Sequence, residues 1–187
     1  MDRWPDRSEA EQILEEWTKN KNLRKHAYAV EAAMRAYAAK FGEDPEKWGV
    51  VGLLHDFDYE KYPDVGDHPF KGVEYLKEQG FSDELTDAIL AHAEHTETNR
   101  DTILKKCIYA VDELTGLVIA VALVRPSKKL ADVKVRSVMK KWKEKTFAAG
   151  VDREIIERGA EELGIELREL IETVLKAMQE ISEKLGL

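Results

Sequence analysis

Apolar residues recur every three or four positions along most of the chain and hardly ever alternate over the length of a strand. Such spacing is typical of helices that bury one face. The pattern therefore predicts an all-α fold, with helices at about residues 8–19, 22–41, 45–56, 68–80, 82–95, 102–124, 128–149, 152–164 and 166–185. Because no repeat or flexible linker separates them, we expect one domain over residues 1–187, with a core at about 22–124 and a helical extension at about 125–187.

Residues with known preferences for helix ends mark several of these boundaries. Ser8, with Glu11 three residues later, resembles a capping box, in which two side chains satisfy free backbone N–H groups. Gly42 favours the left-handed conformation that ends a helix, and Pro45 suits the first turn of the next one. Ser82 is a preferred N-terminal cap. We expect helices to begin or end close to each of these signals.

Several titratable side chains fall where apolar residues are expected. His26, His92 and Asp112 share the three- and four-residue spacing of the apolar residues around them, which places them on core-facing sides of helices. The pair His55-Asp56 follows the apolar run GVVGLL. A single buried histidine is usually a core residue whose ring nitrogens are hydrogen-bonded. A functional site is therefore indicated only by the pattern that these residues form together.

The buried carboxylate of Asp112 needs a cation, because an unpaired buried charge costs several kcal/mol. No Lys or Arg falls on the apolar faces of the neighbouring helices, whereas several of those faces carry histidine. Neutral imidazoles together with carboxylates suit a divalent transition metal. The sequence therefore predicts a metal site to which His55 and Asp56 both contribute from a helix end.

Two further histidines have competing explanations. His68, in GDHPFKG at the start of a predicted helix, either caps that helix or adds a ligand to the site. His95 lies three residues beyond His92 and near the predicted end of its helix. A favourable charge at a helix C-terminus is the simpler role for His95.

Charge and cysteine content narrow the class of protein. With 29 Lys and Arg against 37 Asp and Glu, the net charge of −8 argues against a general electrostatic grip on nucleic acid or on an anionic membrane. A single cysteine, Cys107, excludes an intramolecular disulfide and a thiolate zinc cluster and agrees with a reducing compartment. The start is charged, and no apolar run is long enough to span a bilayer. We expect a cytoplasmic protein without a nucleic-acid or membrane partner, of undetermined oligomeric state.

A basic segment follows the break at 125–127. It contains the cations Arg125, Lys128, Lys129, Lys134, Arg136, Lys140, Lys141, Lys143 and Lys145. A solvated surface is the usual role of such a run. If the segment reaches a site that binds an anion, we expect Arg125 and Lys128 to contact phosphate.

The titratable residues form a pattern that resembles a known family. His26, then His55-Asp56 29 residues later, then Asp112, is similar to the H…HD…D signature of the HD-domain superfamily of metal-dependent phosphohydrolases. The resemblance covers about residues 22–124, and the remaining helices resemble more loosely the tail of small stand-alone bacterial HD proteins. It implies a compact multi-helix HD-domain bundle with extra C-terminal helices. The chain reads HDFD instead of HDIG and lacks the GYP motif of cyclic-dinucleotide phosphodiesterases.

The resemblance also implies a set of ligands and an activity. The principal ion would be held by His26, His55, Asp56 and Asp112, and a second ion by His68, His92 and a bridging Asp56. The implied cofactor is one or two divalent ions of Mn, Fe, Co, Ni or Zn. The implied activity is hydrolysis of a phosphoester in a small phosphorylated molecule, nucleotides included, because such an ion activates water and polarises a phosphoryl oxygen.

Other roles and activities remain open on the sequence. Asp58 and Asp67 lie near the implied ligands and would orient the attacking water or protonate a leaving group, unless they are solvated loop acids. A branch of the same superfamily uses this ligand set in a di-iron oxygenase. A third alternative is a non-catalytic module in which a metal with a filled coordination shell ties helices together.

Overall fold

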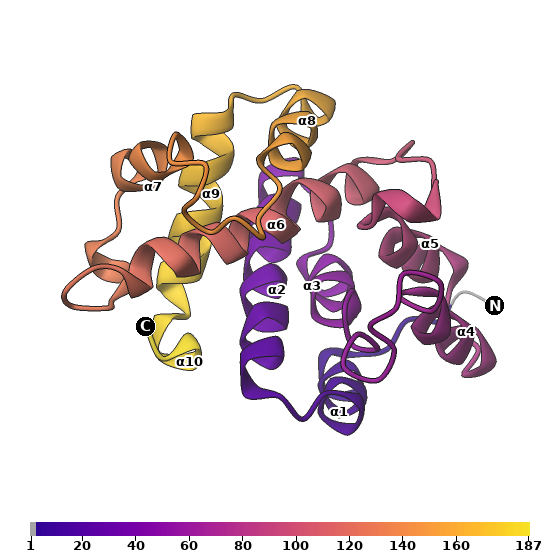
Figure 1. Ribbon diagram of the computed structural model, residues 1–187. Helices are drawn as coiled ribbons and strands as arrows, with labels where there is room; N and C mark the ends of the chain where they lie inside the picture. Colours follow the sequence, from indigo (N-terminus) through magenta and orange to yellow (C-terminus); the bar gives the residue numbers. More distant parts are fainter. Residues whose placement is uncertain (1–2) are drawn as a thin grey trace.

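The computed structural model describes residues 3–187, and within them the chain forms ten α-helices, two short 3-10 helices and no β-strand (Figure 1). The elements are α1 (Arg7–Trp17), α2 (Lys21–Phe41), α3 (Pro45–Leu54), α4 (Phe70–Glu78), α5 (Asp83–Ala91), η1 (Glu94–Thr96), α6 (Ile103–Leu123), η2 (Leu130–Asp132), α7 (Val135–Trp142), α8 (Arg153–Leu163), α9 (Leu167–Glu180) and α10 (Ser182–Leu185). The all-α fold expected from the apolar spacing is confirmed.

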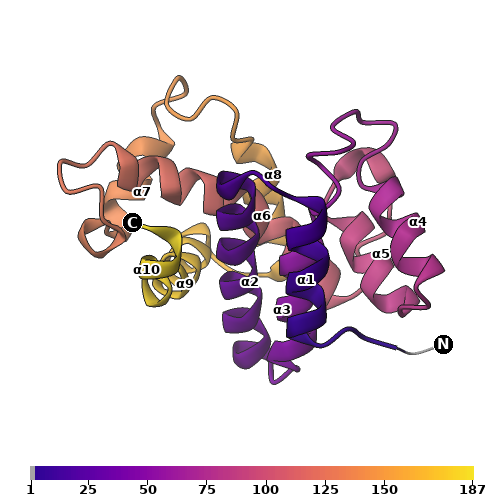
Figure 2. The same ribbon diagram turned by 90° about the horizontal axis from the view of Figure 1, so that it is seen from below.

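Helices α2 and α6 form the centre of the molecule. Figures 1 and 2 show α1, α3, α4 and α5 on one side of this pair and α7, α9 and α10 on the other. Every α-helix contributes buried apolar residues to one continuous core, so the C-terminal helices share the core of the preceding ones. Although α6 has 21 residues, no helix within residues 3–187 combines the length and apolar content needed to cross a membrane.

A close contact between α2 and α3 depends on Gly52. A Cβ atom at this position would lie 2.8 Å from the backbone nitrogen of Glu31 on α2, a separation that real Cβ atoms do not adopt. The absence of a side chain therefore lets the two backbones meet. This contact brings the C-terminal end of α3, where His55 follows, beside the middle of α2, which carries His26.

The caps confirm some of the predicted helix ends and correct one. The side chain of Ser82 accepts from the backbone N–H of Glu84, and Gly42 ends α2 in the left-handed conformation with φ of 73°. The capping box at Ser8 is wrong. Asp6 is the N-terminal cap of α1, and its carboxylate accepts from the backbone N–H of Glu9.

Three predicted helices are shorter than their apolar spacing indicates. The helix expected at 82–95 ends at Ala91, and the one expected at 166–185 is divided into α9 and α10. The basic segment, expected to be helical to about 149, forms only η2 and α7. Leu130, in η2, and Val133, directly after it, are both buried before α7 begins. Their burial explains why the apolar spacing of this segment resembles that of a helix. Apolar spacing therefore identified the buried side chains better than the ends of the helices.

Candidate metal centre

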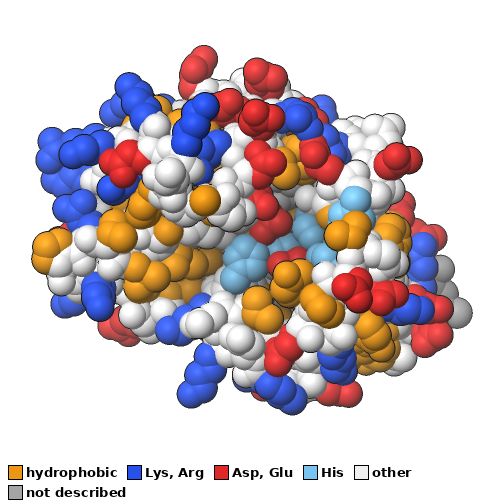
Figure 3. Space-filling view, in the orientation of Figure 1, with side chains coloured by type: hydrophobic (Ala, Val, Ile, Leu, Met, Phe, Trp, Pro, Cys, Tyr) orange, Lys and Arg blue, Asp and Glu red, His pale blue; other side chains and the backbone are white. Residues whose placement is uncertain are grey.

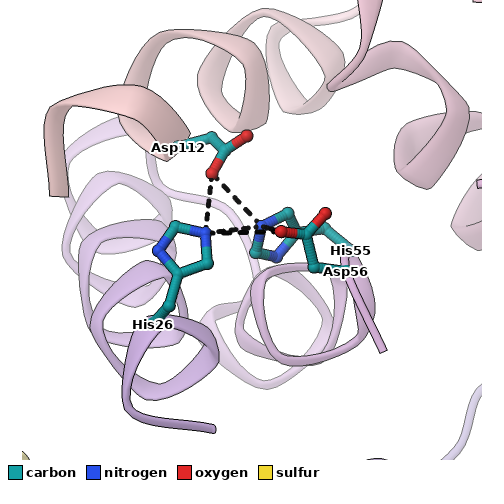
Figure 4. Close-up of side chains that lie close together, drawn as sticks. All are labelled: His26, His55, Asp56 and Asp112. Carbon is teal, nitrogen blue, oxygen red and sulfur yellow. Dashed lines mark hydrogen bonds and ion pairs between the residues drawn. The ribbon is translucent and has the colours of Figure 1, made fainter. Parts of the chain in front are cut away.

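Three helices bring the first group of polar side chains together. His26 comes from α2, His55 and Asp56 follow the last turn of α3, and Asp112 comes from the middle of α6. Figure 4 shows all four pointing toward one another. The Nε2 atom of His26 lies 2.9 Å from Oδ1 of Asp112 and 3.2 Å from Nε2 of His55, and the latter atom lies 3.2 Å from the same Asp112 oxygen.

A second group meets the first at Asp56. Its Oδ2 atom faces the first group, 3.4 Å from Nε2 of His55 and 3.6 Å from Nε2 of His26. Its Oδ1 atom faces the other way, 3.2 Å from Nε2 of His68 and 3.3 Å from Nε2 of His92. One carboxylate therefore lies between two clusters of possible ligand atoms, as the bridging position requires.

Two of the histidines are oriented by backbone carbonyl groups. The Nδ1 atom of His55 lies 2.7 Å from the carbonyl oxygen of Gly52, and that of His92 lies 2.5 Å from the carbonyl oxygen of Ile89. A carbonyl only accepts, so each Nδ1 carries the proton and donates it. The Nε2 atom of each ring therefore faces the centre without needing a proton, as in most metal-binding histidines.

The other two histidines are oriented by side chains. The hydroxyl of Thr115 donates to the carbonyl of Asp112 at 2.9 Å, so it accepts from Nδ1 of His26 at 3.2 Å. The Nδ1 atom of His68 donates to Oδ1 of Asp58 at 2.7 Å. All four imidazoles consequently present Nε2 to the centre, and the role of Thr115 had no signal in the sequence beyond its place one turn after Asp112.

Asp58 is a buried positioning residue rather than a solvated loop acid. Its side chain is 1% exposed, and its Oδ2 atom accepts from the backbone N–H of Gly72 at 2.8 Å. A Cβ at Gly72 would crowd the Asp58 carboxyl carbon at 2.9 Å, so glycine makes this contact feasible. With both oxygens engaged, Asp58 is not placed to touch the attacking water or the leaving group. His68 does not cap α4 either, because no side chain caps that helix.

The buried charges of the two clusters stabilise one another. Burial acts to lower the pKa of His55, but the carboxylates of Asp56 and Asp112 hold that pKa well above its ordinary value. Burial acts to raise the pKa of both carboxyl groups, yet the His55 imidazole keeps them below their usual range. Burial also opposes protonation of His68, whose pKa Asp56 and Asp58 nevertheless raise to about 9. Without a metal ion, the centre therefore holds protons between its imidazoles and carboxylates.

The donor set fits a divalent transition metal in kind and in spacing. Within each cluster the candidate ligand atoms all lie within 4.8 Å of one another. Nitrogen and oxygen ligands bind such ions at about 2.0–2.2 Å, so neighbouring donors on one ion lie about 3 Å apart. Among the described residues, no Lys or Arg forms an ion pair with Asp56 or Asp112. The cation that these carboxylates need is therefore a proton or a metal ion.

A cavity of about 400 Å³ opens onto the two clusters. Its walls are Asp56, Tyr59, His68, His92, Ala93, Glu94, His95, Asp112, Glu113 and Ile155. None of these described lining residues is Lys or Arg. Burial raises the pKa of Glu113, whose Oε2 atom accepts from the backbone N–H of Asp152 at 3.2 Å. Glu94 accepts from the hydroxyl of Tyr109 at 2.6 Å and pairs with Arg158 on α8.

His95 has a different position from the one expected. It lies in η1 beyond the end of α5, so it is not a charge on the last turn of that helix. Its Nε2 atom lies 2.8 Å from the carbonyl oxygen of His68 and donates to it, and its ring packs near Phe70. His95 therefore lines the cavity and supports the chain at His68 without facing the ligand clusters.

The structure does not bring the other expected site residues to the centre. Asp67 is outside the cavity lining, and its carbonyl accepts from the backbone N–H of Lys71. Arg125 lies 13 residues beyond Asp112, which corresponds to about 20 Å along a helix, and donates to the Ser137 hydroxyl at 3.2 Å. Lys128 is an exposed loop residue with a φ of 53°. The structure therefore does not bring Arg125 or Lys128 to the centre, and a contact of either residue with phosphate stays a prediction.

Comparison with known proteins agrees with this geometry. Residues 23–117, just over half of the chain, match the family model described as the HD domain. No curated protein and no solved structure matches the chain significantly. The matched range contains His26, the His55-Asp56 pair and Asp112, the four side chains that converge in Figure 4. The resemblance seen in the sequence is confirmed, and the chain belongs to the HD domain family.

Proposed function

We propose that this protein is a metal-dependent phosphohydrolase that hydrolyses a phosphoester of a small molecule. The observation that supports this proposal most strongly is the position of Asp56. Its Oδ2 atom faces His26 and His55, and its Oδ1 atom faces His68 and His92. A divalent ion bound in such a site lowers the pKa of water and polarises a phosphoryl oxygen, and a pair of ions acts on both the entering and the leaving oxygen. The family is one of mostly metal-dependent hydrolases, which supports the same activity.

In this proposal, some residues of the chain bind the metal ions, and others orient the side chains that bind them. The principal ion is assigned to His26, His55, Asp56 and Asp112, and a second ion to Asp56, His68 and His92. Asp58 and the backbone carbonyls of Gly52 and Ile89 hold three of the imidazoles in the required orientation. Hydrogen bonds of this kind typically change metal affinity 10- to 100-fold, by order of magnitude.

The open cavity favours a catalytic centre over a purely structural one. A structural metal site has a closed shell of protein ligands, whereas a catalytic site keeps a position open to substrate. Here Asp56, His68, His92 and Asp112 all line the cavity of about 400 Å³. The carboxylates of Glu94 and Glu113 lie in the same walls and offer acceptors to hydroxyl groups of a bound molecule.

Metal analysis of the purified protein by mass spectrometry tests the site. We expect about two ions per chain in the wild type and one or fewer in His68→Ala, by the ligand count of the two clusters. The control is Asp64→Ala, which removes an exposed carboxylate four residues before His68 and should keep both ions. One ion in all three proteins would show that the site binds a single metal. No ion in any of them would show that these histidines are ordinary core residues and not ligands.

Metal identity and turnover test the activity. Protein reconstituted separately with Mn, Fe, Co, Ni or Zn should release inorganic phosphate from a panel of phosphomonoesters and phosphodiesters, and Asp56→Ala should not. The ligand set is shared with di-iron oxygenases of the same superfamily, so the iron form is also tested in an oxygen electrode. Oxygen uptake with a polyol or phosphonate, together with no phosphate release by any metal form, would replace the hydrolase by the oxygenase.

A further inference from the structure

The face of α6 that carries Asp112 continues as an apolar strip. Gly116, Ile119 and Leu123 follow Asp112 by four, seven and eleven residues, which places all four side-chain positions on one side of the helix. Gly116 and Ile119 are half-buried, and Leu123 is 49% exposed. Val124, which follows Leu123 at the end of the helix, is 58% exposed. A single helix face therefore has a candidate metal ligand at one end and the exposed side chain of Leu123 at the other.

The strip lies in a hollow that begins at the metal centre. Figure 3 shows apolar side chains over the C-terminal half of α6, in a depression that extends from the histidines toward the left edge of the molecule. The space beside Gly116 is largely open, since a Cβ atom there would meet only Val151 Cγ2, at 3.7 Å. Contiguous exposed apolar surface on a single protein molecule commonly marks a binding groove.

Cations flank this apolar surface. The basic segment begins at Arg125, two residues beyond Leu123, and continues through Lys128 and Lys129. Figure 3 shows Lys and Arg side chains gathered beside the apolar patch at the upper left. The chain as a whole carries a net charge of −8, so this cationic rim is a local feature. These cations lie at the end of the strip that is about 16 Å from Asp112 along the helix, so they flank the apolar surface and not the metal centre.

We propose that the exposed face of α6 binds the apolar part of the substrate. The substrate is then an elongated phosphoester, with its phosphate at the metal centre and its apolar chain along Gly116 and Ile119 toward Leu123. From Asp112 to Leu123 the helix rises by about 16 Å, which sets the length of chain that the strip accommodates. This inference rests on the proposed function for the position of the phosphate.

The shape of the strip favours a chain over a protein or a membrane. A stable interface between two protein copies buries about 800 Å² on each partner, far more than one helix face with a few exposed apolar side chains provides. A bilayer surface needs several apolar side chains that protrude together, whereas Leu123 and Val124 alone are strongly exposed at this end of α6. A narrow apolar chain fits both the width of the strip and its continuity with the centre.

The inference is tested with methyl, hexyl and decyl phosphate, whose binding to the metal-loaded protein is measured by calorimetry below their micelle-forming concentrations. Full burial of one methylene tightens binding about fourfold, so on this open strip we expect a gain of about twofold per methylene. Leu123→Asp should weaken binding of decyl phosphate at least tenfold, by order of magnitude, and leave methyl phosphate unchanged. Leu123→Ser provides the same test with an uncharged side chain.

The matched control is Ile103→Asp on the same helix. Ile103 is 37% exposed, and its position nine residues before Asp112 places it on the opposite side of α6. This variant should bind decyl phosphate as the wild type does. Far-ultraviolet circular dichroism and thermal unfolding establish that each variant is folded before its binding is compared.

Three results would overturn the inference. The first is decyl phosphate binding no tighter than methyl phosphate in the wild type. The second is a concentration-dependent dimer that Leu123→Asp dissociates, which would assign the strip to a second copy of the chain. The third is binding to phosphatidylglycerol vesicles that Leu123→Asp abolishes while decyl phosphate binding is unchanged, which would assign it to a membrane.

Failure of the inference and failure of the proposed function give different results. Binding that strengthens with chain length and weakens in Leu123→Asp, in a protein that hydrolyses none of the phosphates, keeps the apolar site and rejects the hydrolase. Hydrolysis of all three phosphates with one common KM keeps the hydrolase and rejects the apolar site.

Discussion

The two ligand clusters meet at Asp56 but are held in place by different means. In the first, His26 and Asp112 lie in the middle of packed helices, and His55 follows a helix that approaches α2 closely. In the second, His68 lies between α3 and α4, and His92 follows the last residue of α5. Hydrogen bonds orient the imidazoles of both clusters, but the close packing of α2, α3 and α6 places the residues of the first, whereas turns place His68 and His92 of the second. We therefore expect different substitutions to weaken the two proposed ion sites, except at the carboxylate that the two clusters share.

The largest effect is expected at that shared carboxylate. Asp56→Ala removes an oxygen that faces each cluster, so the protein should hold neither ion. Metal content after dialysis, measured by mass spectrometry, checks this. Asp64→Ala is the control, because Asp64 is an exposed acid in the turns before α4. It contacts His68 only through its backbone carbonyl, which accepts from the N–H of His68 and which alanine keeps. Retention of one full ion by Asp56→Ala would show that the clusters do not share this residue.

Gly52→Ala is expected to disturb the first cluster selectively. The new Cβ would press on the α2 backbone at Glu31, and such overpacking typically costs about 1–3 kcal/mol of the free energy of unfolding. Urea unfolding of the metal-free protein measures this loss, and metal titration should show weaker binding of the principal ion. Gly66→Ala is the control, since a Cβ at Gly66 meets no atom within 4 Å. Equal stability of the two variants would contradict the packing argument.

Asp58→Asn should weaken the second cluster and spare the first. An amide at this position is a poorer acceptor for Nδ1 of His68, and loss of such an orienting contact lowers metal affinity by about 10- to 100-fold. Calorimetric titration with Mn or Zn resolves the two binding steps. Asp67→Asn, which changes a nearby acid outside the cavity, should leave both steps unchanged. The comparison between the clusters breaks down if both steps weaken equally in Asp58→Asn.

The smallest effect is expected in the pH dependence of the metal-free protein. The pKa of His68 rises from 6.5 to about 9 on folding, so the proton on His68 stabilises the fold. That contribution is fully present below about pH 6.5 and is lost as the pH rises through about 9. Urea unfolding in the presence of a chelator, with the wild type compared with His68→Ala at each pH, isolates it. A difference between the two proteins that stays constant from pH 6.5 to 9.5 would rule it out.

The sequence predicted well which titratable side chains converge, because helical spacing determines which way a side chain faces. His26, His92 and Asp112 were found on apolar faces of helices, and in the structure their side chains meet at the centre. The same spacing says nothing about which groups are hydrogen-bonded. The contacts of Asp58 with His68 and of Thr115 with His26 therefore required the structure.

Distance along a helix explains why Arg125 does not reach the centre. Arg125 follows the end of the helix that carries Asp112, which made it a plausible phosphate contact. Each residue advances a helix by about 1.5 Å, however, so the turns of α6 after Asp112 carry the chain away from the centre before it reaches Arg125. The early end of α5 has another cause. Nδ1 of His92 donates to the carbonyl oxygen of Ile89, and this local contact accompanies the end of the helix.

The shared core has a consequence for how the protein folds. The family match ends at residue 117, inside α6, and α9 packs against both α2 and α6. A fragment cut at that boundary would lose the last turns of α6 and expose apolar side chains that α9 covers, such as those beside Leu170 and Val174. The region that matches the family model is thus smaller than the unit that we expect to fold cooperatively. Denaturation should accordingly take the family region and the C-terminal helices through a single transition.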